Sequence, residues 1–368
     1  MYGVSQKGRN EMFDSFKVSL CKSAGFSLAV AGLASMLALM PAAAQTTLSE
    51  LAQYRGADRL EKLAAGAKAE GGLMVYTSFT VEDMTAVTDA FTKKYGVPVK
   101  IWRGSSEDVL QRGLAETRAD HNVVDVYENS GRELEALARE KVLVAVESPT
   151  LAQIMPEAVP GHHLWVGSRL NLVVACYNTN LITAQQLPKT WTGLLDPQWK
   201  GKLGIEYEDY DWFATIAQQF QSEKEGVDFF RKLVSTNGLS VRKGHTLLTN
   251  LTASGEVPLA LTVFDFTAKQ VKQSGAPLDW FSIGPIPARL NGVAVSRNAP
   301  HPNAALLFHE YMIGEGQEIL AARGVTTTNV SRVPLPKEIK IKIVDPAFLL
   351  DHGKKWRELY DEIVNAKK

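Results

Sequence analysis

Residues 73–102 read LMVYTSFTVEDMTAVTDAFTKKYGVPVKIW and hold two apolar runs on either side of a helical pattern. Leu73–Tyr76 and Val97–Trp102 have the character of buried strands. Between them, apolar residues recur at helical spacing at Val81, Met84, Val87 and Phe91. The crossover rule makes the two strands of such a βαβ unit parallel, because the connection is right-handed. The stretch therefore predicts an α/β fold.

The ends of this helix are also visible in the sequence. Thr80 is a good N-cap, with Glu82 and Asp83 in the first turn, and Tyr95-Gly96 provides a stop. A second helix is expected after Ser105-Ser106.

The same alternation continues along the chain. Further strands are expected at Val123–Tyr127, Leu170–Tyr177, Leu203–Tyr207, Pro258–Phe264 and Gly292–Ser296. Further helices are expected at Arg132–Glu140, Asp211–Phe220, Glu225–Val234, Leu247–Ala253, Asn303–Ile313 and Lys354–Val364.

The charge balance narrows the possible partners. The 368 residues include 40 Lys and Arg against 40 Asp and Glu, a formal net charge of zero. A general nucleic-acid binder needs an excess of cations to neutralise phosphates, so no nucleic-acid partner is expected.

The N-terminus has the pattern of a secretory signal peptide. Lys17 and Lys22 precede an uncharged apolar run, Ala24–Met40, and small residues follow at 41–44. We expect residues 1–44 to be a cleaved signal, with Met1 and Met12 both able to serve as the start. A membrane anchor is the alternative, but the run is barely long enough to span a bilayer.

Cysteine and histidine offer no obvious chemistry. Cys21 lies in the expected leader, and Cys176 lies in the apolar run Leu172–Tyr177, where a small core residue is expected. His162 and His163 are adjacent on an extended segment, where side chains diverge, so no metal site or cofactor is expected there.

Several junctions between a strand and the following helix are polar. In open α/β sheets, ligands bind outside the carboxyl ends of strands, where helix N-termini offer unpaired N–H groups. Ser, Thr, Asn and Asp are also the usual helix caps, so each junction has a purely structural alternative. The polar junctions are 76–78, 103–106, 128–131, 207–212 and 243–246.

The charges in these junctions are of both signs. The acidic loop consists of Glu206, Glu208, Asp209 and Asp211, beside Tyr207, Tyr210 and Trp212. The basic residues of other junctions are Arg103, Arg169, Lys243 and His245. A zwitterionic or mixed ligand therefore fits as well as a pure anion.

Three motifs in the middle of the chain resemble the central signature of family 1 extracellular solute-binding proteins of ABC importers. They are Pro188–Trp191, Leu194–Pro197 and Trp199–Gly204. The resemblance extends from Leu73 onward, through Ser168–Leu170, Gly255–Leu261, Asn291–Ala294, Pro302–Ala305 and Gly316–Leu320. This family includes periplasmic ferric-ion-binding and thiamine-binding proteins.

The resemblance implies an α/β, two-lobed periplasmic-binding-protein clamshell of type II, each lobe a mostly parallel sheet flanked by helices. Lobe 1 would comprise residues 72–166 and 284–324, and lobe 2 residues 167–283 and 325–368. Residues 45–71 would form a lead-in helix.

Two departures from the ferric-binding members bear on the ligand. Phe264-Asp265-Phe266 stands where those members have two adjacent tyrosines, and Phe79-Thr80 stands at a first-loop ligand position. We therefore expect a small organic, anionic or zwitterionic solute, with a thiamine-like cation as a further possibility. Ferric iron held in a chelate or by other oxygen ligands, Asp265 among them, is the alternative.

The sequence hence predicts a periplasmic, monomeric receptor that passes its solute to an inner-membrane ABC permease and makes or breaks no bond. A sensor subunit with the same fold is also compatible. The alternative of another class is an exported hydrolase using Asp211 with His245, although the common hydrolase motifs are missing. The expected ligand-binding residues are Ser78, Arg103, Ser105, Ser106, Asn129, Arg169, Tyr207, Asp209, Asp211, His245, Phe264 and Asn291.

Overall fold

The computed structural model of the protein describes residues 47–335 and 339–366. The predicted signal peptide at 1–44 lies outside the described residues. No helix in the described ranges is long and apolar enough to cross a membrane.

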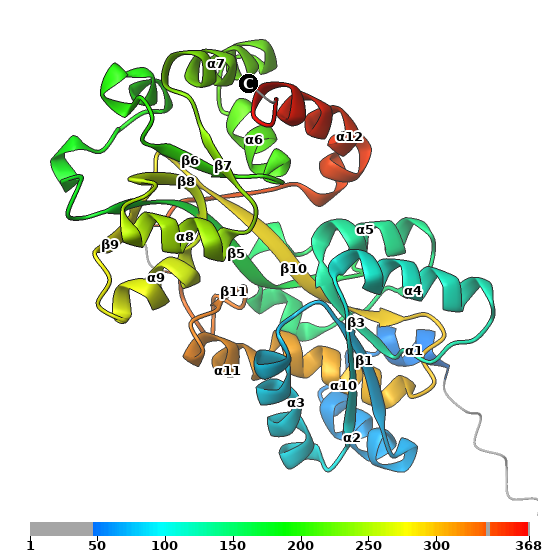
Figure 1. The fold of residues 1–368 in the computed structure, drawn as a ribbon. Coiled ribbons are helices and arrows are strands. Elements are labelled where there is room, and N and C mark those ends of the chain that lie inside the picture. The colour runs from blue at the N-terminus through cyan, green and yellow to red at the C-terminus, as the bar shows by residue number, and fades with distance from the viewer. Residues whose placement is uncertain (1–46, 336–338, 367–368) are drawn as a thin grey trace, which may run out of the picture. The chain divides into compact units, whose positions relative to one another are not determined.

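The strands form one mixed sheet in the order β2-β1-β3-β10-β5-β8-β6-β7, with β4, β9, β11 and β12 paired along its two longest members (Figure 1). Their bounds are β1 Leu73–Thr77, β2 Val99–Arg103, β3 Val126–Ser130, β4 Leu143–Val144, β5 Val166–Asn178, β6 Leu203–Glu206, β7 Ser240–Arg242, β8 Leu259–Phe264, β9 Leu278–Phe281, β10 Ile286–Ser296, β11 Thr326–Thr327 and β12 Ile341–Ile343.

The α-helices lie between these strands. Their bounds are α1 Leu48–Gln53, α2 Arg59–Glu70, α3 Val81–Tyr95, α4 Ser106–Arg118, α5 Gly131–Arg139, α6 Tyr210–Ala217, α7 Glu223–Asn237, α8 His245–Ser254, α9 Asp265–Gln273, α10 Pro302–Ile313, α11 Gly316–Ala322 and α12 Pro346–Ile363. The lead-in segment thus contains two helices, α1 and α2.

The predicted βαβ unit is present. Strands β1 and β2 are parallel, with Leu73 opposite Val99, and α3 connects them. The Thr80 hydroxyl accepts the Asp83 N–H at 3.2 Å, and Gly96 ends the helix at a φ of 72°, a left-handed conformation that favours glycine.

Two long strands, β5 and β10, join the two groups of parallel strands. The parallel groups are β2-β1-β3 and β8-β6-β7, whereas β10 runs antiparallel to β3 and β5, and β5 antiparallel to β8. The expected parallel sheets are therefore parallel at their outer strands and antiparallel at the junction.

Several element boundaries differ from expectation, and two of them differ by six residues or more. β10 begins at Ile286, six residues before the expected Gly292, because Pro287, Arg289 and Asn291 interrupt the apolar pattern while the backbone pairs with β5. α12 begins at Pro346, well before the expected Lys354, because Asp345 accepts the N–H groups of Ala347 and Phe348 and caps it there.

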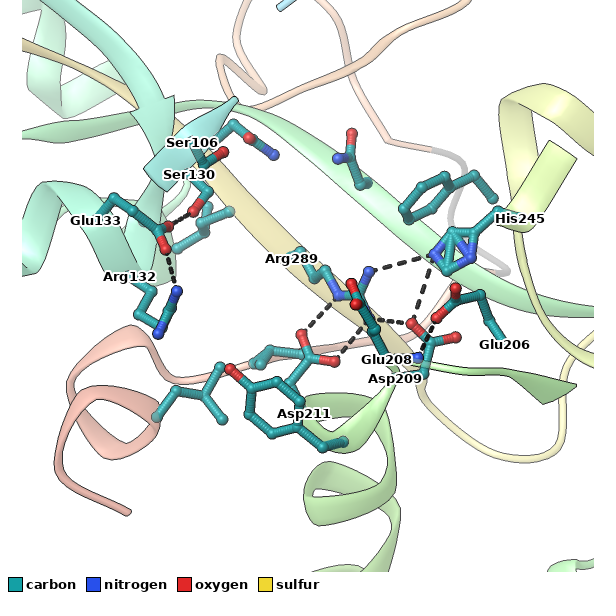
Figure 2. Close-up of a pocket in the computed structure, with 18 of the residues that line it drawn as sticks. Ser106, Ser130, Arg132, Glu133, Glu206, Glu208, Asp209, Asp211, His245 and Arg289 are labelled. Carbon is teal, nitrogen blue, oxygen red and sulfur yellow. Dashed lines mark hydrogen bonds and ion pairs between the residues drawn. The ribbon is translucent and has the colours of Figure 1, made fainter. Parts of the chain in front are cut away.

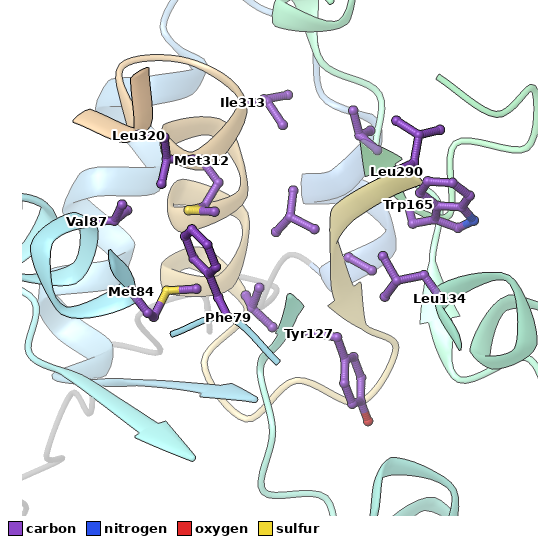
Figure 3. Packing of buried hydrophobic residues seen from close by; sticks show 14 of the residues in the cluster. Phe79, Met84, Val87, Tyr127, Leu134, Trp165, Leu290, Met312, Ile313 and Leu320 are labelled. Atoms are coloured by element: carbon purple, nitrogen blue, oxygen red, sulfur yellow. The ribbon is translucent and has the colours of Figure 1, made fainter. Parts of the chain in front are cut away.

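The buried apolar side chains form two clusters. The larger packs around α10, β1, β3 and β10, and Figure 3 shows part of it, with Phe79, Met84, Trp165 and Met312 among the labelled residues. The smaller is rich in aromatic residues from α6, α7 and α12, including Trp212, Phe213, Phe230, Trp356 and Tyr360. The larger cluster also includes Leu248, Ala260 and Leu278 of the predicted lobe 2, so the two clusters do not follow the predicted lobes, whose boundaries stay a prediction.

Cys176 lies near the C-terminal end of β5 and is fully buried. Burial raises the pKa of its thiol to about 12, so it is not a reactive thiolate.

Candidate functional site

A cavity of about 740 Å³ opens where the carboxyl ends of strands meet the N-termini of helices. Residues at the starts of α4, α5, α6, α8 and α9 line it, together with Thr80, the cap of α3. β10 crosses its floor with Arg289, Leu290 and Asn291. The cavity therefore occupies the position at which open α/β sheets bind ligands.

Carboxylates from the loop between β6 and α6 form one wall, which we call the acidic wall: Glu206, Asp209 and Asp211. All three residues are buried. Arg289 is bonded to two of them: its Nη2 donates to Asp209 Oδ1 and Asp211 Oδ1, both at 2.6 Å, and its Nε donates to Asp211 Oδ2 at 2.6 Å. Figure 2 shows Arg289 reaching into this wall from β10.

The acidic wall changes the ionisation of its members. Burial raises the pKa of Glu206, and the nearby charge of Asp209 adds to this effect. Burial opposes the charge of Arg289, but the carboxylates of Asp211 and Asp209 outweigh it and hold the pKa of Arg289 above its ordinary value. The guanidinium thus stays charged throughout the physiological range.

His245 extends the acidic wall from the first turn of α8. Its Nε2 lies 3.5 Å from Asp209 Oδ1 and 3.4 Å from Arg289 Nη1. Its ring packs edge-on against Phe264 at 4.0 Å between centroids, and Phe264 stacks on Phe266. Burial lowers the pKa of His245, so its imidazole is neutral at pH 7.

The opposite wall carries hydroxyl groups and a guanidinium. Ser106 begins α4, and Ser130, Arg132 and Glu133 belong to the start of α5. Glu133 is buried and bonds both Ser130 and Arg132, and burial raises the pKa of its carboxyl. Figure 2 shows this group and the acidic wall on two sides of the cavity, with Arg289 between them.

A second cavity, of about 720 Å³, adjoins the first through shared lining residues that include Ser106 and Asn291. Arg169 lines it but is held by a buried ion pair: its Nε donates to Glu128 Oε1 at 3.1 Å. Its guanidinium also lies 4.1 Å from the centroid of the Phe79 ring.

Eight of the twelve expected ligand-binding residues line these two cavities. Ser106, Asp209, Asp211, His245, Phe264 and Asn291 line the first, and Ser78 and Arg169 line the second.

The other four lie elsewhere. Ser105 caps α4 in a capping box with Asp108, and Asn129 is buried with its amide donating to the Ser106 carbonyl at 3.0 Å. Arg103 reaches the Phe79 carbonyl at 3.5 Å. Tyr207 is exposed beside the last turn of the chain, where Asn365 donates to its carbonyl. Capping, the structural alternative, accounts for Ser105, whereas Asn129 is not a cap and bonds the backbone of Ser106.

The main residue that the sequence reading missed is Arg289. It lies in the part of β10 that precedes the expected strand 292–296, and a lone cation inside a buried strand was the available signal. Glu206, although part of the noted acidic loop, was also left out of the expected set, as were Ser130 and Arg132.

Two earlier suggestions find other partners. The Asp265 carboxylate is buried and accepts from Lys269 Nζ at 2.7 Å, and Asp265 does not line the described cavities. His162 and His163 diverge as expected, to Glu135 and Glu147 respectively.

The fold is that of two-lobed periplasmic binding proteins. The solved structure of AfuA from Actinobacillus pleuropneumoniae, with fructose-6-phosphate bound, is similar at a TM-score of 0.64 and 22% identity, over 80% of this chain and 99% of that one. A Trichodesmium protein, IdiA or FutA, in complex with iron and citrate, is similar at a TM-score of 0.68 and 20% identity, over 80% and 99% of the two chains.

The chain belongs to the bacterial extracellular solute-binding protein family, whose model matches residues 129–352. It is 26% identical over 316 residues to the Fe(3+)-binding periplasmic protein of Serratia marcescens, covering 81% of this chain and 92% of that protein. Since the family and these relatives are binding proteins, the chain is a binding protein and not an enzyme. The hydrolase alternative has no support.

Proposed function

We propose that this receptor captures a small polar organic solute that carries an anionic group together with hydroxyl or amine groups, in the periplasm, and delivers it to an inner-membrane ABC permease. The observation that carries the proposal is the cavity itself, where helix N-termini from both groups of parallel strands converge between two chemically different walls.

The anionic group belongs at the wall formed by α4 and α5. The N–H groups of a helix's first turn are unpaired within the helix, and the helix dipole favours negative charge there. Ser106 and Ser130 add hydroxyl donors, and Arg132 adds a guanidinium, which matches carboxylate or phosphate oxygens well. A phosphomonoester or a carboxylate fits this wall.

The other end of the solute belongs at the acidic wall. Carboxylate oxygens accept hydrogen bonds from hydroxyl or ammonium groups, and Arg289 can donate to an oxygen placed between the walls. Phe264 and Phe266 supply an apolar face for a carbon skeleton. A bare inorganic anion would leave the acidic wall without a partner.

Ferric iron carried in an organic chelate is the second candidate. It is favoured by the relative that binds Fe(3+) and by the similar structure that holds iron with citrate. Phenolates suit ferric iron, but Tyr210 is the one tyrosine among the described residues that line the first cavity. A chelate would supply the missing oxygen ligands and reach the helix N-termini with its carboxylates.

The test is calorimetric titration of the purified chain with three probes: fructose-6-phosphate, citrate and ferric citrate. We expect an organic anion to bind at one site per chain, and Arg132→Gln to weaken that binding at least 10-fold. The matched control is Arg139→Gln, which removes an arginine from the exposed surface of the same helix.

The outcomes separate the two candidates. Binding of fructose-6-phosphate or metal-free citrate supports the organic solute. Binding of ferric citrate alone transfers the function to the second candidate. If Arg132→Gln and Arg139→Gln behave alike, the assignment of the anionic group to the start of α5 is wrong.

A further inference from the structure

The acidic wall contains three side chains arranged as a metal-binding group. One ligand atom from each of Glu206, Asp209 and His245 lies within 4.8 Å of the other two. They come from two different elements, since the carboxylates follow β6 and the imidazole begins α8. The three donors therefore converge by tertiary folding, and not as neighbours along one acidic loop.

Two of these groups have a buried side-chain atom without a hydrogen-bond partner. Asp209 Oδ2 has no hydrogen-bond partner among the described residues, while the Asp209 side chain is only 2% exposed. His245 Nδ1 likewise has no partner in the described part of the chain. A buried polar atom without a partner is unfavourable, so a carboxylate oxygen left in this state at a cavity points to a ligand.

The charge of the wall identifies the sign of that ligand. Glu206, Asp209 and Asp211 bring three acidic side chains, and Arg289 is bonded to two of them, Asp209 and Asp211. Because one guanidinium faces the carboxylates of both Asp209 and Asp211, the pair keeps an excess negative charge that attracts a further positive charge.

The donor set identifies the kind of cation. Two carboxylates and a neutral imidazole suit a borderline divalent ion such as Zn²⁺, and three protein ligands leave a coordination position open for a solute. Two ligands on one zinc ion are about 3.3 Å apart, so a small side-chain rotation closes the present spacing. Glu206 is already positioned, since its Oε1 accepts the Gly244 N–H at 2.9 Å.

We propose that Glu206, Asp209 and His245 form a binding site for a divalent metal ion of the zinc type, open toward the cavity. The site goes beyond the proposed function, because the ion binds the chain in the absence of any solute. When a solute is present, the open position faces its oxygen or nitrogen atoms, so the ion would select solutes that can coordinate it.

The experiment uses the purified chain without a polyhistidine tag, stripped with EDTA and then titrated with Zn²⁺ in the absence of solute. Native mass spectrometry and calorimetry should give one tightly bound zinc per chain. Asp209→Asn and His245→Gln should each weaken zinc binding at least 10-fold. His352→Gln, which removes an exposed imidazole from α12, should leave it unchanged.

A spectroscopic readout guards against variants that simply misfold. Co²⁺ in place of zinc should give visible absorption bands from the bound ion, and these should change in His245→Gln while the circular dichroism spectrum and melting temperature stay near those of the parent chain.

Failure of this proposal is distinguishable from failure of the proposed function. A chain that binds fructose-6-phosphate or citrate but no stoichiometric zinc overturns the metal site alone. Stabilisation by putrescine without zinc binding also overturns it, since the wall would then serve an organic ammonium. Zinc binding that survives both site variants overturns the assignment of the ligands.

Discussion

Two arginines on the two long strands show how alike charges can serve different purposes. Arg169 on β5 faces one carboxylate, Glu128, and the pair is buried, with side chains 6% and 0% exposed. Arg289 on β10 faces two carboxylates and retains 22% exposure of its side chain at the cavity.

The surroundings of the two arginines differ in the balance between carboxylates and cations. Glu128 is satisfied by Arg169 on one oxygen and by the Thr77 hydroxyl on the other, at 2.5 Å. In the Arg289 cluster, carboxylates outnumber the bonded cation and Asp209 Oδ2 is left without a partner among the described residues. A balanced buried pair supports the fold, whereas an unbalanced one at a cavity is suited to a ligand.

The largest effect is expected from breaking the balanced pair. Glu128→Ala leaves the Arg169 guanidinium buried without its carboxylate, and such a loss costs about 3–5 kcal/mol of unfolding free energy. Urea denaturation followed by circular dichroism measures it. The double variant with Arg169→Met should recover part of this loss, because it removes the stranded charge.

If Glu128→Ala lowered the unfolding free energy by less than about 1 kcal/mol, the pair would contribute no more than an exposed ion pair, and its structural role would be contradicted.

His309 tests whether a buried polar atom without a hydrogen-bond partner is by itself evidence for a ligand. His309 on α10 is fully buried, and neither of its ring nitrogens has a partner in the described structure. Unlike Asp209, it does not line the cavities described above. Burial lowers the pKa of His309 to about 4, so the folded chain resists its protonation.

Acid should therefore weaken the fold through His309. Between the folded pKa of about 4 and the ordinary pKa of 6.5, the unfolded chain binds more protons than the folded chain. This contribution to unfolding free energy is present in full above pH 6.5 and is lost as pH falls toward 4, by about 3 kcal/mol in total. Denaturation at several pH values measures it, with His309→Leu as the comparison.

Other groups also titrate in this range, so the decisive quantity is the difference between the two pH profiles. Parallel profiles for the parent chain and His309→Leu would show that the buried imidazole is not the source. Zinc affinity should be the same in both proteins.

The next effect has opposite signs for folding and for metal binding. Arg289→Gln leaves Asp209 and Asp211 without their cation and should cost about 2 kcal/mol of stability, less than the Glu128 variant because the arginine is partly exposed. The same change removes a positive charge beside the proposed ion and should tighten zinc binding at least 3-fold. Arg169→Gln should lower stability without changing zinc affinity.

Weaker zinc binding in Arg289→Gln would mean that the arginine serves chiefly to position Asp209. Arg289 would then have a structural role, as Arg169 has in its pair with Glu128.

Local signals in the sequence sufficed for much of the fold. The βαβ unit at 73–103 follows from apolar spacing and from the Thr80 cap, which are properties of neighbouring residues. The early part of β10 did not follow, because Arg289 and Asn291 contradict a buried strand locally. Their pairing with β5 depends on a segment more than a hundred residues away.

The candidate site shows the same limit. The acidic loop could be singled out from its composition, and His245 from its place at the start of a helix. That Asp209 and His245 lie 3.5 Å apart, with Arg289 between the walls, depends on how β6, α8 and β10 pack. Arg169 was expected to bind ligand and does line the second cavity, but only the structure shows that its charge is already paired with buried Glu128.

The smallest effect is expected at Ser105, whose role could not be assigned from its position in the sequence alone. Ser105 was expected to bind ligand, but its hydroxyl accepts the Asp108 N–H at 3.1 Å as the N-cap of α4, and it does not line the described cavities. Ser105→Ala should cost about 1 kcal/mol of stability, the usual value of a lost cap. Because its neighbour Ser106 faces the cavity instead, Ser106→Ala should weaken solute binding while Ser105→Ala leaves it unchanged. Denaturation and calorimetry on the two variants measure both quantities, and a larger binding loss from Ser105→Ala would place the anionic wall at the wrong residues of α4.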